Sequence, residues 1–301
     1  MKKFLGVTLA SIFATVCVGW AIATHGLTPA SSLTPTSEVL LTADVNWEQL
    51  NPARGDRSPQ AGTLWGDRTG PGPAGFLLKP VDGFRSPPHI HNVAYRGVVI
   101  EDTIHNDDPA AEDMFMPPGS FWTQPAGEVH ITAARGDRAL AYIEVEDSFG
   151  VQPAADAFDS GERPVNVDAS NIVWLDASST DWIDQSTLVE PAKSPAIAFL
   201  WGDFRGAHPN KNLNGTLVKF PAGFSGIVHS QGSPIRAVVI KGQPQYAVLG
   251  KAGRDILKPG SYFSSTGQLA HQIESAFDAE TILYVRTNGK FNIASSSTPL
   301  R

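Results

Sequence analysis

Short runs of β-branched and aromatic residues, separated by turns, dominate the hydrophobic pattern of the chain. Residues 138–145 and 281–285 are typical of these runs. Windows with apolar residues at i, i+3, i+4 and i+7 over several turns are rare, so the pattern does not favour long helices. The 28 glycines and 23 prolines suit tight turns, because glycine adopts positive φ and proline fixes φ. With roughly eight to ten such runs in each half, the pattern predicts an all-β protein.

The same sequence blocks occur twice, about 140 residues apart. A Leu-Trp-Gly-Asp block begins each copy, followed by a histidine-containing block and a Pro-Gly-Ser block. The corresponding positions are Leu64–Asp67 with Leu200–Asp203, Gly83 with Gly223, His89 with His229, Arg96–Ile100 with Arg236–Ile240, Pro118–Phe121 with Pro259–Tyr262, and His130 with His271. Blocks in one order and at nearly one spacing indicate that the two halves share a fold.

Histidines concentrate in these repeated blocks. His89 and His91 are two residues apart in an extended segment, and alternation along a strand directs both side chains to the same face. His130 comes from a later strand, after a turn. Three neutral imidazoles that converge inside a barrel would bind a divalent transition metal and leave open coordination positions. We therefore predict a metal site at His89, His91 and His130, with iron, manganese or zinc as the ion.

The spacing around these histidines resembles the two cupin motifs. Gly83 is followed by five residues and His89-Ile90-His91, as in the first motif. Gly119 is followed by five residues, Pro125-Ala126-Gly127 and then His130, as in the second. The resemblance covers residues 47–301, and the chain is similar to an exported family of two-domain cupins (bicupins) of unknown function. It implies two tandem cupin barrels of the double-stranded β-helix (jelly-roll) type and a bound metal, but no particular substrate.

Two positions depart from the first motif. Tyr95 stands where cupins usually have a glutamate ligand, and Asp102 replaces the closing glycine. A phenol is a poor ligand at neutral pH, because its ordinary pKa is near 10. We predict that Tyr95 instead orients the substrate by hydrogen bonding. Glu128, two residues before His130, is the candidate for a fourth ligand or proton-transfer group; alternatively it is a rim residue that contacts only solvent.

The second half has lost part of the motif. His229 and His271 remain, but Gln231 replaces the second histidine and Ile235 occupies the glutamate position. Two histidines and an amide bind a divalent metal weakly. We predict that His229, Gln231 and His271 form a relic polar cluster or a small hydrogen-bonding pocket, with a weak metal site as the alternative. Outside the motifs, His105 lies in a polar stretch and is predicted to occupy a solvated hairpin tip.

The amino-terminal residues predict export. Lys2 and Lys3 precede an apolar run, and Ala21-Ile22-Ala23 matches a signal-peptidase site; an uncleaved anchor is the alternative. The predicted organisation is a signal peptide at 1–23, a disordered spacer at 24–37, an amino-terminal barrel at 38–150, a linker at 151–165 and a carboxy-terminal barrel at 166–301. The protein would then be periplasmic or secreted.

Cleavage would change the chemistry available to the protein. It would remove the single cysteine, Cys17, and leave 21 basic residues against 30 acidic ones, a formal net charge of −9. The mature chain could form no disulfide and offer no thiolate. Its acidity argues against nucleic acid as a partner and against binding to anionic membranes beyond the signal segment. A homodimer is compatible with barrel edges that need covering.

The metal site leads to a functional hypothesis. We expect a metal-dependent enzyme that acts on a small organic molecule at the first barrel, and a dioxygenase is favoured by analogy with other three-histidine cupins. An isomerase or a hydrolase would use the same residues. A non-catalytic periplasmic module that binds or senses a metal or ligand is the alternative from a different class, motivated by the missing glutamate and the altered second half.

Overall fold

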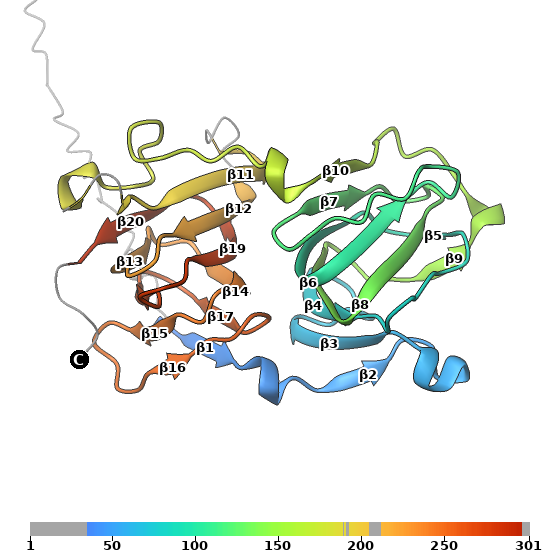
Figure 1. Cartoon of the computed structure of the whole chain (residues 1–301), viewed down its shortest axis with the longest axis horizontal. Helices are drawn as coiled ribbons and strands as arrows, with labels where there is room; N and C mark the ends of the chain where they lie inside the picture. The colour runs from blue at the N-terminus through green and yellow to red at the C-terminus, as the bar shows by residue number, and fades with distance from the viewer. Residues whose placement is uncertain (1–34, 189, 191–192, 205–211, 297–301) are drawn as a thin grey trace, which may run out of the picture. The chain divides into compact units, whose positions relative to one another are not determined.

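The computed structural model describes residues 35–188, 190, 193–204 and 212–296. The predicted signal peptide and most of the predicted spacer lie outside this range, and Ser37, at the end of the spacer, begins the first strand. Nearly all regular structure is antiparallel β-sheet, as predicted (Figure 1). The described 3₁₀ turns are η1 Thr42–Asp44, η2 Pro52–Arg57, η3 Ala154–Asp156, η4 Ala169–Asn171 and η5 Gln185–Thr187. Within the described ranges, no helix has the length and apolar character needed to span a membrane.

The first barrel combines a seven-stranded sheet with a two-stranded sheet. The strand order is β10-β7-β6-β8-β4-β3-β2 in the larger sheet and β5-β9 in the smaller one. Their bounds are β2 Trp47–Gln49, β3 Gln60–Trp65, β4 Ala74–Lys79, β5 His89–His91, β6 Tyr95–Asp107, β7 Phe121–Gln124, β8 Ile131–Val145, β9 Val151–Pro153 and β10 Val165–Val167.

The second barrel consists of a six-stranded and a five-stranded sheet. The orders are β1-β17-β14-β19-β12-β11 and β16-β15-β18-β13-β20. The bounds are β1 Ser37–Leu40, β11 Ala196–Gly202, β12 Leu213–Phe220, β13 Ser225–Ser230, β14 Ile235–Lys241, β15 Gln245–Val248, β16 Asp255–Ile256, β17 Tyr262–Ser265, β18 Ala270–Glu274, β19 Thr281–Asn288 and β20 Phe291–Ser295.

Two long strands close the first barrel around the site. β6 and β8 pair along nearly their whole length, and the register shifts between Val99 and Thr103. Asp102 lies at this bend with φ of 51°, a left-handed conformation that few non-glycine residues adopt. Its counterpart Gly242 has φ of 86°. The closing glycine of the cupin motif is therefore replaced, but the left-handed turn that it makes is kept.

The halves exchange edge strands. β1 pairs with β17 of the second barrel, and β10 pairs with β7 of the first. The exchanged segments form hydrogen bonds with the serines of the two Pro-Gly-Ser blocks. Ala169 N–H donates to Ser120 Oγ at 2.9 Å, and Thr42 N–H donates to Ser261 Oγ at 3.2 Å. The strand pairing thus crosses the domain boundaries expected from sequence, and the segment expected as a linker contributes β9 to the first barrel.

Further repeated residues meet where the barrels contact each other. Trp65 donates its indole N–H to the Tyr142 hydroxyl at 3.0 Å, and Trp201 donates to Tyr284 at the same distance. Both phenols donate to Glu144 Oε2 at 3.1 Å, from opposite halves. The repeated tryptophans therefore join the two barrels and do not line the histidine site.

Charged groups complete this contact. The buried Glu144 carboxylate accepts a hydrogen bond from Arg286, which also pairs with Glu146 at 2.9 Å. The guanidinium of Arg96 lies 3.8 Å from the Trp201 ring centroid, and its counterpart Arg236 lies 4.4 Å from that of Trp65. An apolar cluster with residues from both halves surrounds this network, and each barrel has a separate core of its own.

Candidate metal centre

Three histidine side chains converge in the first barrel. His89 and His91 belong to β5, and His130 forms an isolated antiparallel bridge with His89. One ring nitrogen from each lies within 4.8 Å of the others. In the described part of the chain, this is the one group of three or more histidine, cysteine or acidic side chains close enough to share an ion. The structure thus brings together the three histidines that the spacing singled out.

Hydrogen bonds fix the orientation of all three rings. Each Nδ1 lies close to a main-chain carbonyl oxygen, which can only accept a hydrogen bond. The carbonyls belong to Pro87 for His89 at 2.9 Å, Gly150 for His91 at 2.9 Å, and Glu128 for His130 at 3.1 Å. Nδ1 must therefore carry the proton, and Nε2 keeps its lone pair. Partners of this kind commonly orient metal-ligating histidines in proteins.

The environment keeps the imidazoles neutral. Burial lowers the pKa of His91 well below its ordinary value and that of His130 to about 3, and neighbouring imidazoles add to both effects. His89 is partly exposed; burial lowers its pKa as well, and the positive charge of Arg54 acts in the same direction. Unprotonated nitrogens are what a metal ion requires, so the donor set fits a divalent transition metal.

Tyr95 lies beside the histidines in a buried polar network. Its hydroxyl donates to Asn106 Oδ1 at 2.7 Å and lies 3.3 Å from His130 Nε2. Thr132 also donates to Asn106, whose amide donates to Gln124. Burial raises the pKa of Tyr95, so its phenol remains neutral. Sequence reasoning did not identify Asn106 or Gln124, because neither belongs to a cupin motif.

Glu128 takes part through its main chain. Its carbonyl accepts from His130 Nδ1 and, at 3.3 Å, from the Gln124 amide, but its carboxylate is not part of the histidine group. The side chain instead lines a surface hollow of about 500 Å³ together with Asp159 and Arg163. The structure therefore does not place Glu128 as a fourth ligand, and its geometry resembles the rim residue that was the alternative.

The segment after β8 covers the His-x-His strand. The Phe149 ring stacks on His91 with centroids 4.1 Å apart, and β9 pairs with β5. Asn92 holds this segment, since its side chain donates to Ser148 O and accepts from Gly150 N–H. No motif indicated these contacts; they were missed because the glycine- and acid-rich composition after residue 146 resembles a linker.

The second barrel presents a different arrangement. His271 is fully buried, with Nδ1 2.9 Å from the Tyr246 hydroxyl and Nε2 2.8 Å from the Ser265 hydroxyl. His229 and Gln231 are exposed. Both nitrogens of His271 thus have protein partners, and the three residues predicted to form one polar cluster do not share one buried pocket.

His105 corrects another expectation from the sequence. It was expected in a solvated hairpin tip, but it lies within β6 and is completely buried. Met114 N–H donates to His105 Nδ1 at 3.1 Å, and the Phe115 ring packs against the imidazole. The strand extends further than its polar sequence suggested, because the following loop folds back and covers it.

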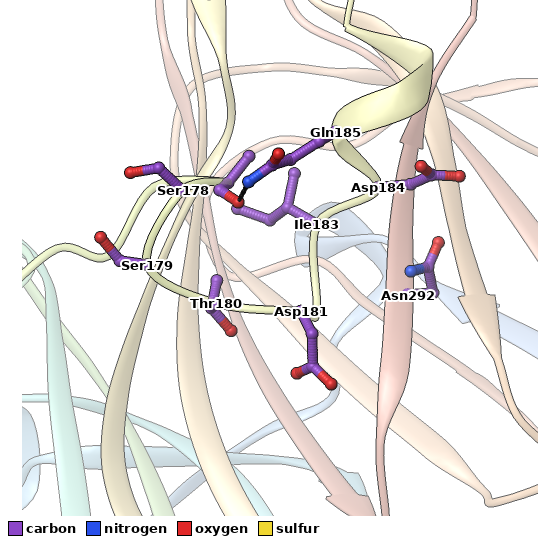
Figure 2. Close-up of a pocket in the computed structure, with 9 residues that line it drawn as sticks. Ser178, Ser179, Thr180, Asp181, Ile183, Asp184, Gln185 and Asn292 are labelled. Atoms are coloured by element: carbon purple, nitrogen blue, oxygen red, sulfur yellow. Dashed lines mark hydrogen bonds between the residues drawn. The ribbon is translucent and has the colours of Figure 1, made fainter.

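A second surface hollow, of about 540 Å³, lies in the other half of the chain (Figure 2). Ser178, Thr180 and Asp181 lie along one side, and the Gln185 amide donates to the Ala177 carbonyl. Its lining contains no histidine. The hollow is therefore separate from the candidate metal centre.

Comparison with solved structures shows the fold. A candidate dioxygenase from Nostoc punctiforme is 14% identical, with 87% of each chain covered and a TM-score of 0.59. Salicylate 1,2-dioxygenase from Pseudaminobacter salicylatoxidans is 15% identical, with 87% of each chain covered and a TM-score of 0.53. Oxalate decarboxylase from Lactobacillus farciminis is 11% identical, covering 85% of this chain and 88% of that one, with a TM-score of 0.52. Identities this low establish the cupin fold alone.

Comparison at the level of sequence gives the family. A search of curated proteins finds no match to this chain. A family model described as a domain of unknown function, DUF4437, matches residues 38–294, which span both barrels. The chain therefore belongs to the DUF4437 family and has the cupin fold.

Proposed function

We propose that His89, His91 and His130 hold one divalent transition metal ion, and that the protein is a metal-dependent enzyme acting on a small organic molecule. One observation carries this proposal: all three Nδ1 atoms donate to main-chain carbonyls, so each Nε2 is unprotonated, and one ring nitrogen from each histidine lies within 4.8 Å of the others. The Tyr95 hydroxyl, which lies 3.3 Å from His130 Nε2, donates its proton to Asn106 and leaves that lone pair available. His271 in the second barrel shows the contrasting arrangement, because both of its nitrogens have hydrogen-bond partners in the protein.

The surrounding residues support a reaction at this site. Iron, manganese or zinc held by three neutral histidines would supply a Lewis acid with open positions for a substrate oxygen and for water or dioxygen. Tyr95 would orient the substrate by hydrogen bonding: because its one O–H donates to Asn106 Oδ1, the phenol oxygen would accept a hydrogen bond from a substrate hydroxyl. Phe149 shields one face of His91 from water.

Within this class, the proposal favours a dioxygenase. Two solved structures with the same fold are described as a candidate dioxygenase and a salicylate dioxygenase, and this likeness supports the choice by analogy. An isomerase or hydrolase would use the same residues with a redox-inactive ion. Oxygen consumption by the iron- or manganese-loaded protein separates these options, because an isomerase or hydrolase consumes none.

The first test is the metal content of protein purified without a metal-affinity tag. We expect near one equivalent of a transition metal in the wild type and almost none in His89→Ala/His130→Ala. His229→Ala is the matched control, since it removes the exposed counterpart of His89 in the second barrel. Wild-type protein that holds no metal as purified, and takes up none on reconstitution, would overturn the proposal and favour a non-catalytic binding module.

We also propose that the protein is exported. The apolar run that follows Lys2 and Lys3 and ends in Ala21-Ile22-Ala23 supports this. Amino-terminal sequencing of the protein from the periplasm or medium is expected to begin at Thr24. Recovery of the full-length chain from the cytoplasm would contradict it.

A further inference from the structure

Two residues near opposite ends of one strand meet beside the histidines. Tyr95 begins β6, and Asn106 lies close to its end, 11 residues later. A straight strand would hold them about 36 Å apart, because each residue of a strand advances by about 3.3 Å. The bend at Asp102 instead brings the Tyr95 hydroxyl to 2.7 Å from Asn106 Oδ1. The bend thus gives the tyrosine at the usual glutamate position a buried amide as its partner.

Neighbouring strands supply the other members of this network. Gln124, the cross-strand partner of Tyr95, accepts a hydrogen bond from the Asn106 amide at 3.0 Å. Thr132, the cross-strand partner of Asn106, donates its hydroxyl to Asn106 Oδ1 at 2.8 Å. The Gln124 amide donates in turn to the Glu128 carbonyl at 3.3 Å. Apart from Glu128, these residues are buried, so their polar groups depend on one another for partners.

A main-chain carbonyl fixes the direction of these hydrogen bonds. The Glu128 oxygen can only accept, so the amide nitrogen of Gln124 faces it and the amide oxygen of Gln124 faces Asn106. Asn106 must then donate through its nitrogen, and its oxygen is left to face Tyr95 and Thr132. Because an amide oxygen only accepts, both hydroxyls must donate to it. Reversing the two amides would place two carbonyl oxygens against each other at Glu128, without a hydrogen bond between them.

The same carbonyl also fixes the proton of His130. The Nδ1–H of His130 donates to the Glu128 oxygen at 3.1 Å, so Nε2 carries a lone pair. The Tyr95 oxygen lies 3.3 Å from Nε2, close enough to donate a hydrogen bond to it if the hydroxyl turned. A phenol has one proton, and Asn106 accepts it. The lone pair of His130 therefore stays available to an ion because Asn106 holds the Tyr95 proton.

We propose that Asn106 is a positioning residue for the metal centre: it keeps the Tyr95 proton away from His130 Nε2 and so preserves the affinity of the three histidines for the ion. Gln124 supports Asn106 by holding its amide in the required orientation. Asn106 acts on His130 through Tyr95 and is not itself one of the candidate ligands. This inference rests on the proposed function, because it requires that the histidines bind a metal.

The test compares zinc affinity in the wild type, Asn106→Leu, Tyr95→Phe and the double variant, by competition with a chelator. Asn106→Leu removes the acceptor, so the Tyr95 hydroxyl is expected to donate to His130 Nε2, and zinc must then break this hydrogen bond. We expect zinc to bind about tenfold more weakly. Tyr95→Phe alone should change the affinity by less than about twofold, because the wild-type hydroxyl already donates elsewhere.

The double variant separates positioning from general damage to the fold. Without a hydroxyl at residue 95, no phenol proton competes for His130 Nε2, so Tyr95→Phe should restore the zinc affinity of Asn106→Leu to near the wild-type value. Thr132→Val is the matched control, since it removes the other donor to the same Asn106 oxygen and should bind zinc as the wild type does. Unchanged affinity in Asn106→Leu, or a loss that Tyr95→Phe does not restore, would overturn the proposal.

Nitrogen-15 NMR of the metal-free protein tests the direction of the Tyr95 proton without any change at Asn106. An unprotonated imidazole nitrogen changes its chemical shift when it accepts a hydrogen bond. We expect the Nε2 resonance of His130 at nearly the same position in the wild type and in Tyr95→Phe, because the wild-type hydroxyl donates to Asn106. A resonance that moves on Tyr95→Phe as it does on loss of a hydrogen bond would overturn the proposal, even if Asn106→Leu does not fold.

Zinc binding by the wild type separates failure of this inference from failure of the proposed function. If the wild type binds one zinc ion and Asn106→Leu binds it equally well, the metal site stands and the role of Asn106 is wrong. If the wild type binds no zinc, the proposed function fails, and this inference fails with it.

Discussion

The two barrels share a fold and a histidine at the same place, yet they use that histidine differently. In the first barrel, His130 Nδ1 donates to a main-chain carbonyl, Nε2 lies 3.3 Å from the Tyr95 hydroxyl, and the ring lies beside two more imidazoles. In the second, both nitrogens of His271 meet protein hydroxyls, from Tyr246 and Ser265. The same fold thus supports a potential ligand in one half and a satisfied core residue in the other.

The features kept in both halves explain what the repeat preserves. The tryptophan–tyrosine hydrogen bonds occur twice, and a side chain at Gly75 or Gly215 would collide with them. These residues join the barrels, so both copies are needed for the contact. The candidate metal ligands act within a single barrel. Replacement of the counterpart of His91 in the second barrel therefore leaves the contact between the barrels intact. We infer that the two halves share these residues mainly because they hold the barrels together, and less because of the chemistry of the histidine site.

The largest expected effect comes from removing Glu144, a residue of the contact between the barrels whose counterpart in the other half has a different side chain. Glu144 and Arg286 occupy corresponding strand positions but carry opposite charges, and both are buried. Burial works against the charge of Arg286, but its hydrogen bonds to Glu146 and the charge of Glu144 raise its pKa. Glu144→Ala would leave this cation and two phenols without their shared acceptor. We expect the free energy of unfolding, measured with urea, to fall by about 3–5 kcal/mol.

Asp159→Ala is the control for that change. It breaks an exposed, solvent-screened pair with Arg163 and should leave the free energy of unfolding almost unchanged. Equal losses of unfolding free energy in the two variants would show that the Glu144 network contributes no more than a surface ion pair. That result would contradict the inference that the repeated residues serve to join the barrels.

Much of this comparison could be predicted from the sequence. Alternation and motif spacing gave the all-β fold and the three histidines, because both are local properties of a strand and its turns. The hydrogen-bond partners in the site could not be predicted: Asn106, which accepts from Tyr95, and Gly150, which accepts from His91, reach the site only through long strands and a returning segment. The exchange of β1 and β10 was also hidden, since an edge strand of three or four residues carries little pattern.

The stability that neutral His271 contributes to the second barrel is expected to depend on pH. Burial lowers the pKa of His271 to about 4, whereas an unfolded histidine titrates near 6.5. The unfolded chain thus binds more protons between these values, and stability contributed by neutral His271 is lost as the pH falls from about 6.5 towards 4. At about 1.4 kcal/mol per pH unit, this amounts to about 3 kcal/mol.

Urea unfolding of metal-free protein at a series of pH values measures this effect. The stability difference between wild type and His271→Gln should narrow by about 3 kcal/mol between pH 7 and pH 4. The other histidines titrate in both proteins and cancel in the difference. Zinc should bind to both equally, because His271 is not a ligand. If the stabilities of wild type and His271→Gln changed with pH in the same way, or if His271→Gln bound less zinc, His271 would not be the neutral core residue that distinguishes the second barrel from the first.

The smallest expected effect lies at the bend where Asp102 and Gly242 correspond. Both are left-handed, but the Asp102 carboxylate accepts a hydrogen bond from Arg138 N–H at 2.8 Å, which offsets the strain of a side chain there. Asp102→Gly should therefore change the free energy of unfolding by less than about 1 kcal/mol. In Gly242→Asp, the new Cβ would press on the Glu280 carbonyl oxygen, so a loss of about 1–2 kcal/mol or more is expected. Unfolding both variants with urea checks this, and equal costs would mean that the Asp102 side chain gives its turn no support.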